Sequence, residues 1–577
     1  MQLDMPNEVL LKQAQRNLFD YMRETSSYSD DTVVFEYFHK KQTFGSFCSM
    51  VYQIADTLLE MGIESGDKVL ISLITTPASI SLVYACSAIG AVSVMTDVRL
   101  PTPELYSLIC ETKVKIAFIS DFSLSDPKLL ASPKTLKYLV VVSPCDTLPW
   151  ITRFFRSINM LFQGKLHLFG RQFASKIVYW NDLFKQRAKQ YASERLIHAG
   201  DGELLFTTSG TTGTRKYVRI RASALNLAAY RFHYCMDLSQ IRSVLSVMPI
   251  FTCYGFLNSV HAPLVFSKKL FIYPIYRFGR FPHMLKKTKA SASFGVLGQW
   301  ESLTRSRSTA KTDFSFLKYA SWGGDGCTVE RLTEINRFLS EHHCSVKLCQ
   351  GYGMTETVSA ATLQTPEDYK AGSAGKPLPF VKICIVEEGS NHILPAGIVG
   401  EICIHSFCQT TGYYQDDIST KDLIRVHDDG CKWIHSGDLG YLDEDNHLFV
   451  VGRKKRMIVS ENGTKVFLSR LEGLVLSDDH VADCAAVSVS DTKRNHCVSI
   501  ALFVKAEKQT HTARIKRRIA NLIHQNLPDY LYPDQIIIVR RIPKTALGKT
   551  DYPELTALWL MHCTGTKARF NNMESYC

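Results

Sequence analysis

Short β-rich runs alternate with helical stretches through the first half of this chain, and this alternation constrains the fold more than any other feature. Runs rich in Val, Ile, Leu and Phe occupy residues 68–74, 91–95, 114–119, 138–142, 243–248, 269–273 and 292–296. Such alternation is typical of parallel sheets covered by helices. The sequence therefore predicts an α/β protein with a large N-terminal domain built on parallel sheets.

One stretch of this region, Val69 to Met95, carries no charged residue and is long enough to cross a bilayer. It contains Pro77, two threonines and five serines, which a membrane-spanning helix rarely combines. The stretch also divides into a β-like run, a turn at 75–78, an apolar helix over 79–89 and a second β-like run. We therefore interpret it as a buried strand–helix–strand unit.

The pattern changes beyond residue 375. Closely spaced strands with Gly and Asp turns are predicted at 382–386, 401–405, 433–436 and 447–451. The last 120 or so residues then read as a compact α+β unit with strands at 485–489, 498–504 and 535–540 and a basic amphipathic helix at 512–526. We expect an N-terminal domain over 1–453, with a small β subdomain over 375–453, and a small mobile C-terminal domain over 454–577.

Composition places the chain among globular proteins. With 577 residues, 45% of them hydrophobic and 21% charged, it is too long for one core and too apolar to be disordered. Its net charge of +12 suits nucleotides or coenzyme A, but equally a nucleic acid or an acidic membrane surface. No basic stripe with stacking aromatic residues accompanies the charge, so a nucleic-acid partner is not expected.

The 17 cysteines form no CxxC pair, and the first 16 residues carry charges in place of an apolar leader. We therefore expect reduced thiols in a cytoplasmic protein. His342-His343-Cys344 lacks a second ligand pair at zinc-site spacing, so no metal is expected there. The segment 150–176 combines an apolar helical face with basic residues; it is expected to dock on its own protein, and the alternative is peripheral contact with anionic lipid.

Five motifs carry the chemistry. The first, Thr207 to Lys216, is a Ser/Thr/Gly run ending in a lysine, and its glycines would let backbone N–H groups approach phosphate oxygens. It does not match the Walker pattern, and taken alone it reads as a phosphate loop or simply as a flexible loop. The other motifs lie at Gly351–Thr357, Gly400–Ile402, Ser436–Tyr441 with Gly452-Arg453, and Pro543–Lys549.

The residues of these four motifs suit a nucleotide. Tyr352 offers an aromatic face for a purine, and Glu356 offers a carboxylate of the kind that binds Mg²⁺ beside a triphosphate. Asp438, in a tight Ser-Gly-Asp turn, can accept hydrogen bonds from two ribose hydroxyls. Lys549, in a loop framed by Pro and Gly, can deliver a cation to charge that develops at phosphorus. Each residue alone also has an ordinary reading, as a helix cap, a turn or a surface lysine.

In their order and spacing the five motifs resemble those of the adenylate-forming superfamily, which includes acyl-CoA synthetases, nonribosomal-peptide adenylation domains and firefly-type luciferases. The resemblance runs from about residue 30 to about residue 555. It implies that Thr355 touches the α-phosphate, Glu356 holds Mg²⁺, Lys549 is catalytic and Lys455 is the hinge. It also implies that the nucleotide is held by Thr208, Ser209, Gly210, Thr211, Thr212, Gly213, Lys216, Gly323, Gly324, Gly351, Tyr352, Asp438 and Arg453.

The chain departs from the family pattern at several positions. Arg215 replaces a proline, and Leu468 and Arg470 stand where Pro and Glu are commoner. Thr252 stands where many acyl-activating members have histidine and amino-acid-activating members have aspartate. Without that aspartate an α-ammonium group would be buried unpaired at a cost of several kcal/mol. An amino-acid substrate is therefore not expected.

The resemblance implies an ATP-dependent acid–thiol ligase that converts a fatty or aromatic acid to an acyl-AMP, releases pyrophosphate and passes the acyl group to coenzyme A. An apolar pocket for the acid is expected from Tyr254, Gly255, Gly298, Trp322 and Met354. Two alternatives remain: a stand-alone enzyme that loads the phosphopantetheine of an acyl carrier protein, and a non-catalytic ATP-binding relative.

Overall fold

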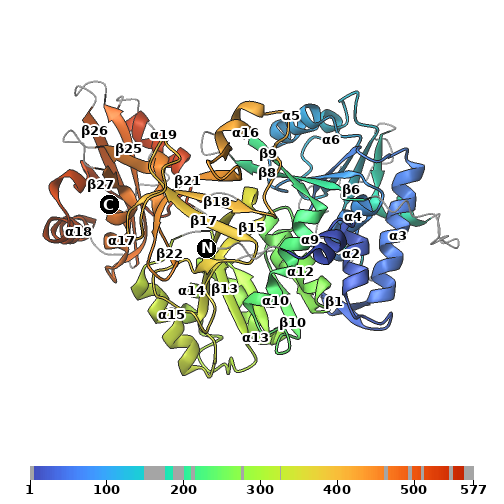
Figure 1. The fold of residues 1–577 in the computed structure, drawn as a ribbon, viewed down its shortest axis with the longest axis horizontal. Coiled ribbons are helices and arrows are strands. Elements are labelled where there is room, and N and C mark those ends of the chain that lie inside the picture. Colours follow the sequence, from blue (N-terminus) through green and yellow to red (C-terminus); the bar gives the residue numbers. More distant parts are fainter. Residues whose placement is uncertain are drawn as a thin grey trace.

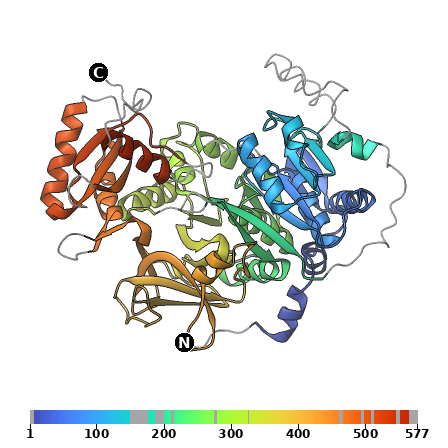
Figure 2. The ribbon, with the colours of Figure 1, turned by 90° about the horizontal axis from the view of Figure 1, so that it is seen from above.

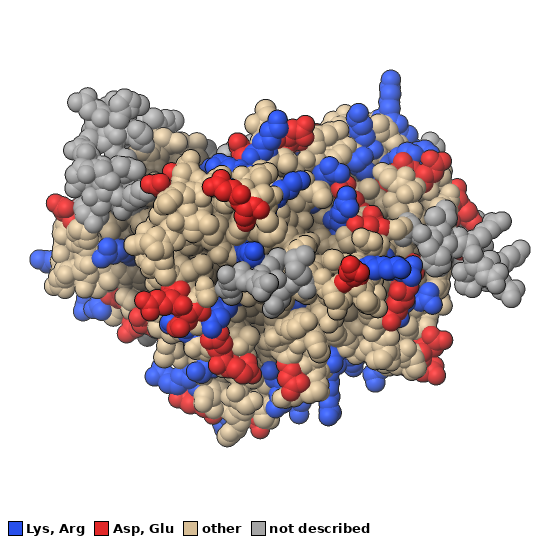
Figure 3. All heavy atoms as spheres, viewed as in Figure 1, with Lys and Arg blue, Asp and Glu red and all other residues tan. Residues whose placement is uncertain are grey.

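The computed structural model describes residues 6–148, 176–185, 200–209, 215–273, 278–324, 326–459, 465–491, 497–507, 512–544 and 550–563. Figure 1 shows a broad main body, with the C-terminal strands and helices as a smaller unit at the left. The predicted amphipathic segment over 150–176 lies almost wholly outside the described residues. On the face drawn in Figure 3, basic and acidic side chains are interspersed, so the positive net charge is not gathered into one stripe there.

An eight-stranded sheet forms one half of the main body, and most of its strands are parallel, as predicted. Its strands lie in the order β19 (Gly412–Tyr413), β9 (Arg215–Arg221), β8 (Glu203–Ser209), β4 (Val92–Met95), β3 (Lys68–Ser72), β5 (Ile116–Ser120), β6 (Tyr138–Val142) and β7 (Ile177–Tyr179). Between β3 and β4 runs α4 (Pro77–Ala88), which is buried on every side. This complete burial explains the charge-free stretch, and it confirms the strand–helix–strand interpretation.

A nine-stranded sheet forms the other half. Its order is β16 (Lys376–Pro377), β15 (Ser359–Leu363), β14 (Leu348–Met354), β13 (Tyr319–Gly323), β12 (Ala292–Gly295), β10 (Ser243–Ser246), β11 (Lys269–Ile272), β1 (Val33–Tyr37) and β2 (Lys40–Thr43). One continuous core joins the two sheets, and it includes Ile71 and Phe118 from the first sheet, Val244 and Phe294 from the second, and the helices between them.

A five-stranded antiparallel sheet follows, built from β17 (Val381–Val386), β18 (Gly400–Ser406), β20 (Ile424–Val426), β21 (Lys432–Leu442) and β22 (Leu448–Arg453). These strands overlap each of the predicted short strands of this region. In Figure 2 the orange strands of this sheet lie on the same side of the molecule as the C-terminal unit. The sheet is the small β element that the closely spaced Gly and Asp turns indicated.

The C-terminal unit contains α17 (Leu468–Leu476), the strands β25 (Val481–Asp491), β26 (Cys497–Ala506) and β27 (Gln535–Ile538), and the helices α18 (Thr512–Asn526) and α19 (Tyr552–Cys563). Helix α18 has the predicted bounds and buries Ile515, Ile519 and Ile523 along one face. The unit touches the main body where Arg331 Nη2 donates to the carbonyl of Ala482 at 3.2 Å. Within the described residues, every helix is too short or too polar to cross a membrane.

Candidate active site

Two of the predicted nucleotide-binding glycines lie on adjacent parallel strands, Gly323 at the carboxyl end of β13 and Gly351 in the middle of β14. Gly323 on β13 is the direct register partner of Gly351 on β14. A Cβ atom added to Gly323 would lie 3.1 Å from the carbonyl oxygen of Gly351, so the two backbones approach closely. Gly324 follows with a φ of +103°, a conformation that favours glycine. This edge is where ligands bind in open α/β sheets.

The predicted ribose residues form one hydrogen-bonded cluster. Asp438 on β21 is the register partner of Arg453 on β22, and the Arg453 Nε lies 2.7 Å from Asp438 Oδ1. The Tyr352 hydroxyl donates to Asp438 Oδ2 at 2.8 Å. Asp438 is only 5% exposed. Burial, followed by the nearby Asp438 carboxylate, raises the pKa of Tyr352, so its phenol stays protonated as the donor. The structure thus brings Tyr352, Asp438 and Arg453 together.

Glu356 lies just beyond the end of β14, the strand that carries Tyr352, in the short 3₁₀ helix Thr355–Thr357. It is 6% exposed, and the Tyr413 hydroxyl donates to its Oε1 at 2.8 Å. Burial raises the pKa of Glu356, while the hydrogen bond from Tyr413 and the charges of Arg453 and Lys216 oppose that rise. The Lys216 Nζ lies 4.5 Å from the centre of the Tyr413 ring. A desolvated carboxylate of this kind suits a bound cation.

Sequence reasoning missed Tyr413. It lies on β19, a strand of Gly412 and Tyr413 that pairs with β9 and so joins the eight-stranded sheet. The pairing places its hydroxyl against Glu356 and its ring beside Lys216. The signal in the sequence was weak, because Thr-Gly-Tyr-Tyr after the Gly400–Ile402 motif reads as a turn. Tyr413 links two motifs that lie about 140 residues apart in the chain.

The predicted phosphate loop connects the two strands of an antiparallel hairpin. Thr208 on β8 is the register partner of Lys216 on β9, and Ser209 is the partner of Arg215. Gly210, Thr211, Thr212 and Gly213 lie in the connection, outside the described residues. Arg215 explains one departure from the family pattern, because its Nη2 lies 2.7 Å from a carboxylate oxygen of Glu104. A proline could not make this ion pair.

The structure describes the predicted hinge residue but not the predicted catalytic lysine. Lys549 lies outside the described residues, between Lys544 and Thr550, which pair through a β-bridge. Lys455 lies in the 3₁₀ turn Lys454–Arg456 that follows β22. Its role as the hinge stays a prediction.

Arg456 ends a run of four basic residues, Arg453–Arg456, but it is not a solvated charge. Its side chain is 23% exposed, and its Nη2 donates to Glu472 Oε1 at 2.6 Å. The guanidinium carbon also lies 3.6 Å from the centre of the Tyr552 ring. A run of basic residues gives no sign in the sequence of which side chain is buried. The turn after β22 brings the Arg456 side chain into contact with the C-terminal unit. Lys454 is more exposed, with its Nζ 3.6 Å from Glu401.

The structure describes all five residues of the predicted acid pocket. Tyr254, at the start of the helix Cys253–Phe256, donates its hydroxyl to the Gly295 carbonyl at 3.1 Å. Gly298 and Met354 are half-buried. A Cβ on Gly255 would lie 2.1 Å from the Pro249 carbonyl oxygen, so the close packing of that turn already requires glycine there. These positions are compatible with a pocket near the end of β12, and the pocket itself stays a prediction.

Trp322 does not line this region, which corrects the prediction. It is 1% exposed and packs in a core cluster with Trp300, Leu332 and Ile335. Side chains alternate between the faces of a strand, so neighbours on β13 point in opposite directions. Ser321, the preceding residue, is the one whose side chain reaches Tyr254. Trp322 therefore lies on the face of β13 that is opposite to Tyr254.

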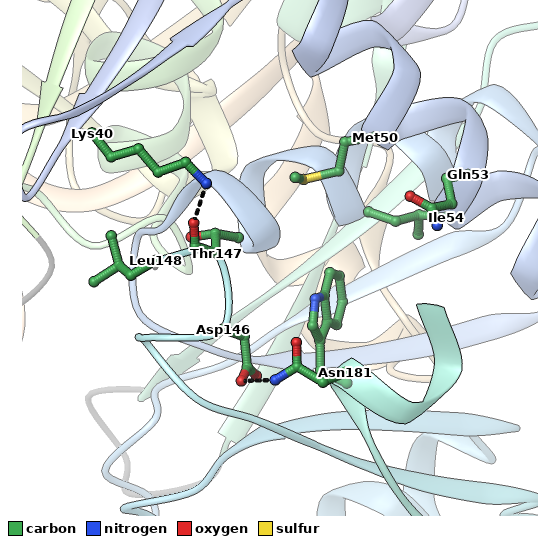
Figure 4. A pocket seen from close by; sticks show the side chains of 9 residues that line it. Lys40, Met50, Gln53, Ile54, Asp146, Thr147, Leu148 and Asn181 are labelled. Carbon is green, nitrogen blue, oxygen red and sulfur yellow. Dashed lines mark hydrogen bonds between the residues drawn. The ribbon is translucent and has the colours of Figure 1, made fainter. Parts of the chain in front are cut away.

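A cavity of about 280 Å³ lies elsewhere, between the helix Phe44–Glu60 and the end of β6. Figure 4 shows two hydrogen bonds among the residues that line it, from Lys40 to the Thr147 carbonyl and from Asn181 to Asp146. Met50 also lines the cavity. None of its lining residues belongs to the five motifs. The cavity borders Leu148, the last described residue before the predicted amphipathic segment, and it is separate from the candidate active site.

Comparison with known proteins agrees with this geometry. The AMP-binding enzyme profile matches residues 22–414, and the profile of the AMP-binding enzyme C-terminal domain matches residues 470–549. The chain belongs to the AMP-binding enzyme family. It is 24% identical to indoleacetate–CoA ligase of Aromatoleum aromaticum over 88% of this chain and 91% of that protein. It is 25% identical to 2-succinylbenzoate–CoA ligase of Bacillus cereus over 93% of this chain and 98% of that protein.

Solved structures share the fold. The anthranilate CoA ligase AuaEII, in complex with anthranoyl-AMP, aligns with a TM-score of 0.78 at 17% identity over 96% of this chain and 98% of that chain. ATP-bound MatB from Rhodopseudomonas palustris aligns with a TM-score of 0.78 at 18% identity over 94% and 98% of the two chains. The predicted fold class, a large parallel-sheet domain followed by a small C-terminal domain, is confirmed.

Proposed function

We propose that this enzyme is an AMP-forming acid–thiol ligase that acts on a fatty or aromatic acid. An oxygen of the acid attacks the α-phosphorus of ATP, the bond to pyrophosphate breaks, and acyl-AMP forms. The sulfur of coenzyme A then attacks the acyl carbon and AMP leaves with the bonding electrons. The relatives named as CoA ligases support this assignment, and so does the apolar surrounding of Tyr254.

The observation that carries the proposal is the short stretch from Tyr352 to Glu356. At one end Tyr352 joins the Asp438 and Arg453 cluster, and at the other end Glu356 is buried beside Tyr413. A nucleotide bound with its ribose at Asp438 would direct its phosphates along this stretch toward Thr355, Glu356 and Lys216. A nucleoside triphosphate with its metal uses both groups, because its ribose hydroxyls need an acceptor and the cation on its phosphates needs a carboxylate.

The residues present fit a divalent cation. Glu356 is desolvated, its pKa is raised, and a cation beside it would stabilise its ionised form. We assign Mg²⁺ to Glu356, where it would neutralise charge on the phosphates. Lys549 is assigned to stabilise the charge that develops as pyrophosphate departs, and Lys455 to the hinge between the two half-reactions.

The proposal is tested by pyrophosphate release from ATP and Mg²⁺ across a panel of fatty and aryl acids, with and without coenzyme A. We expect release that depends on one class of acid, rises with coenzyme A and falls at least about 100-fold in Lys549→Ala. Release confined to a slow single turnover that coenzyme A does not accelerate would favour a carrier-protein acceptor. ATP binding without release for every acid would contradict the proposal and favour a non-catalytic relative.

A further inference from the structure

The C-terminal unit meets the main body through polar contacts. In the part of the chain that the structure describes, each apolar core cluster belongs either to the main body or to the C-terminal unit, and none combines side chains from both. Two units without a shared apolar core are expected to change their relative orientation readily. A few polar side chains therefore decide how the C-terminal unit lies on the main body.

Arg331 makes one of these polar contacts and connects it to a second helix of the main body. It lies in the first turn of α15 (Val329–Glu341), which Figure 1 shows beside the C-terminal unit. Its Nη2 donates to the Ala482 carbonyl on β25 at 3.2 Å. Its Nη1 donates to Glu301 Oε1, on α14 (Leu297–Arg305), at 3.2 Å. The planar guanidinium thus binds an acceptor in each unit at once.

The position of Arg331 in α15 is unfavourable for the helix itself. The N-terminus of a helix carries partial positive charge, so acidic residues are stabilising in its first turn and basic residues are not. The cap is made by other groups, because Thr328 accepts the Arg331 backbone N–H at 3.4 Å. The Arg331 side chain is only 19% exposed. Its contacts with Glu301 and Ala482, and not the stability of α15, therefore explain the arginine.

The C-terminal unit offers Arg331 a suitable acceptor. The pairing of β25 with β26 shifts register between Val481 and Asp483, so Ala482 lies at an irregular position in the ladder. A residue at a bulge is left out of strand pairing, and its carbonyl can accept from another donor. The next residue, Asp483, forms an ion pair with Lys544, whose Nζ lies 2.8 Å from Asp483 Oδ2. The contact with Arg331 therefore fixes the end of β25 that also holds Lys544.

This contact joins the two parts of the proposed adenylating site. In the main body, α15 follows the glycine segment at the carboxyl end of β13, which is predicted to bind the nucleotide. In the C-terminal unit, Lys544 pairs with Thr550 through a β-bridge, and the predicted catalytic Lys549 lies between them in the sequence. The Arg331 contact therefore connects the strand that holds Lys544 to the helix that begins beside the nucleotide glycines.

We propose that Arg331 is a positioning residue for the first half-reaction, because it docks the C-terminal unit in the orientation that serves formation of acyl-AMP. The inference rests on the proposed function, which assigns Lys549 to this step and Lys455 to the hinge. Formation of the thioester uses another orientation about the hinge, so it does not depend on the contact between Arg331 and Ala482. Arg331 acts only through the position of the C-terminal unit.

The test compares the two half-reactions in Arg331→Ala. Acid-dependent exchange between pyrophosphate and ATP measures the first, and conversion of added acyl-AMP by coenzyme A measures the second. We expect exchange to fall at least about tenfold and thioester formation to change by less than about twofold, because only the docked orientation loses a charge-assisted hydrogen bond. An equal loss in both half-reactions, or unchanged exchange, would overturn the proposal.

Arg305→Ala is the matched control. The Arg305 Nη2 also faces the C-terminal unit, 4.0 Å from Glu507 Oε2, but both side chains are more than one-third exposed. An exposed ion pair at this separation contributes little, so both half-reactions should stay within about twofold of the wild type. A loss of exchange in Arg305→Ala as large as that in Arg331→Ala would contradict the role given to Arg331.

A milder variant covers the case in which Arg331→Ala fails to fold. Arg331→Lys keeps a positive charge beside Glu301, but one ammonium group lacks the fork that reaches Ala482 at the same time. Its exchange rate should stay below that of the wild type while thioester formation is kept. Wild-type exchange in Arg331→Lys would overturn the proposal.

Small-angle X-ray scattering of the full chain reads the docking without turnover. The radius of gyration should be larger in Arg331→Ala than in the wild type and in Arg305→Ala, and equal values would contradict the docking. A wild type that exchanges pyrophosphate with no acid would contradict the proposed function and this inference with it. A wild type that exchanges, beside an Arg331→Ala variant that matches it in exchange and scattering, would overturn this inference alone.

Discussion

Two buried glutamates, Glu356 in the main body and Glu472 in the C-terminal unit, show how one residue type serves two purposes. Burial raises the pKa of both. Glu472 receives the Arg456 guanidinium at 2.6 Å, the Ala486 N–H at 2.8 Å and the Tyr552 hydroxyl at 3.2 Å. Its charge is balanced within the protein by a direct ion pair.

The charge of Glu356 is balanced less completely within the protein. It accepts a hydrogen bond from Tyr413, whereas Lys216 and Arg453 act on it through space. A buried carboxylate with direct cationic and N–H partners fixes a local structure, and one without a direct cationic partner suits an external cation. The comparison predicts that Glu356 matters for turnover and Glu472 for stability.

The largest expected effect is the loss of turnover in Glu356→Gln. Glu356→Gln should lower kcat/KM for acid-dependent pyrophosphate release at least about 100-fold, because it removes the charge that holds the cation. The free energy of unfolding should stay the same or rise, because a desolvated carboxylate is removed. Steady-state kinetics and urea denaturation on one preparation measure both quantities. Unchanged turnover together with a large loss of stability would reverse the assigned roles.

Glu472→Ala should destabilise the C-terminal unit by about 3 kcal/mol, because it leaves the half-buried Arg456 without its partner. Hydrogen exchange of the β25 amides reports the change locally. Glu554→Ala is the matched control, since Glu554 is exposed in the same unit and should change exchange little. Equal protection in the two variants would show that the Arg456 ion pair does not fix the unit.

Tyr413→Phe should mainly change how activity depends on pH. The Tyr413 hydroxyl lowers the pKa of Glu356, so its removal raises that pKa further. Because the ionised carboxylate is the active form, activity is lost as pH falls through this pKa, and the acid limb of the pH–rate profile should move to higher pH. At the optimum the loss should be about tenfold or less. An acid limb that stays in place would exclude Tyr413 as a partner of Glu356 in turnover.

The same raised pKa gives stability its own pH dependence. A carboxyl group with a folded-state pKa above its unfolded value binds its proton more tightly when folded, so Glu356 removes stability as pH rises from the ordinary glutamate value through the folded one. In Glu356→Gln this decline should become shallower. Denaturation midpoints across that pH range measure it, and parallel curves for wild type and variant would contradict the raised pKa.

The smallest effect is expected at Arg215. Its partner Glu104 is about half exposed, so Arg215→Ala should change the free energy of unfolding by about 1 kcal/mol or less. Thermal unfolding measures this. A larger loss would mean that the hairpin carrying the predicted phosphate loop depends on this ion pair.

Much of the fold was predictable because burial leaves a strong local signal. The strand–helix–strand unit over 69–95 is apolar on every side, and α18 shows its buried face at helical spacing. Residues within one motif were also predictable, because the spacing that holds Tyr352 and Glu356 on one stretch is visible in the sequence. Asp438 and Arg453 belong to different strands, and the family resemblance was needed to bring them together.

The residues that were missed depend on pairing between distant strands. Tyr413 belongs to no motif in the sequence and meets Glu356 and Lys216 only because β19 pairs with β9 in one sheet. Trp322 was misplaced because the face on which a strand residue lies depends on its register. In each case the deciding information is which strands pair, and a single sequence does not contain it.

The central claim is that the stretch from Tyr352 to Glu356 serves an adenylating site, and isotope exchange between pyrophosphate and ATP tests it most directly. With a suitable fatty or aryl acid and Mg²⁺, the wild type should incorporate labelled pyrophosphate into ATP, and omission of the acid should abolish the exchange. Glu356→Gln should lose it while Glu472→Gln keeps it. Exchange that needs no acid, or that persists undiminished in Glu356→Gln, would contradict the account.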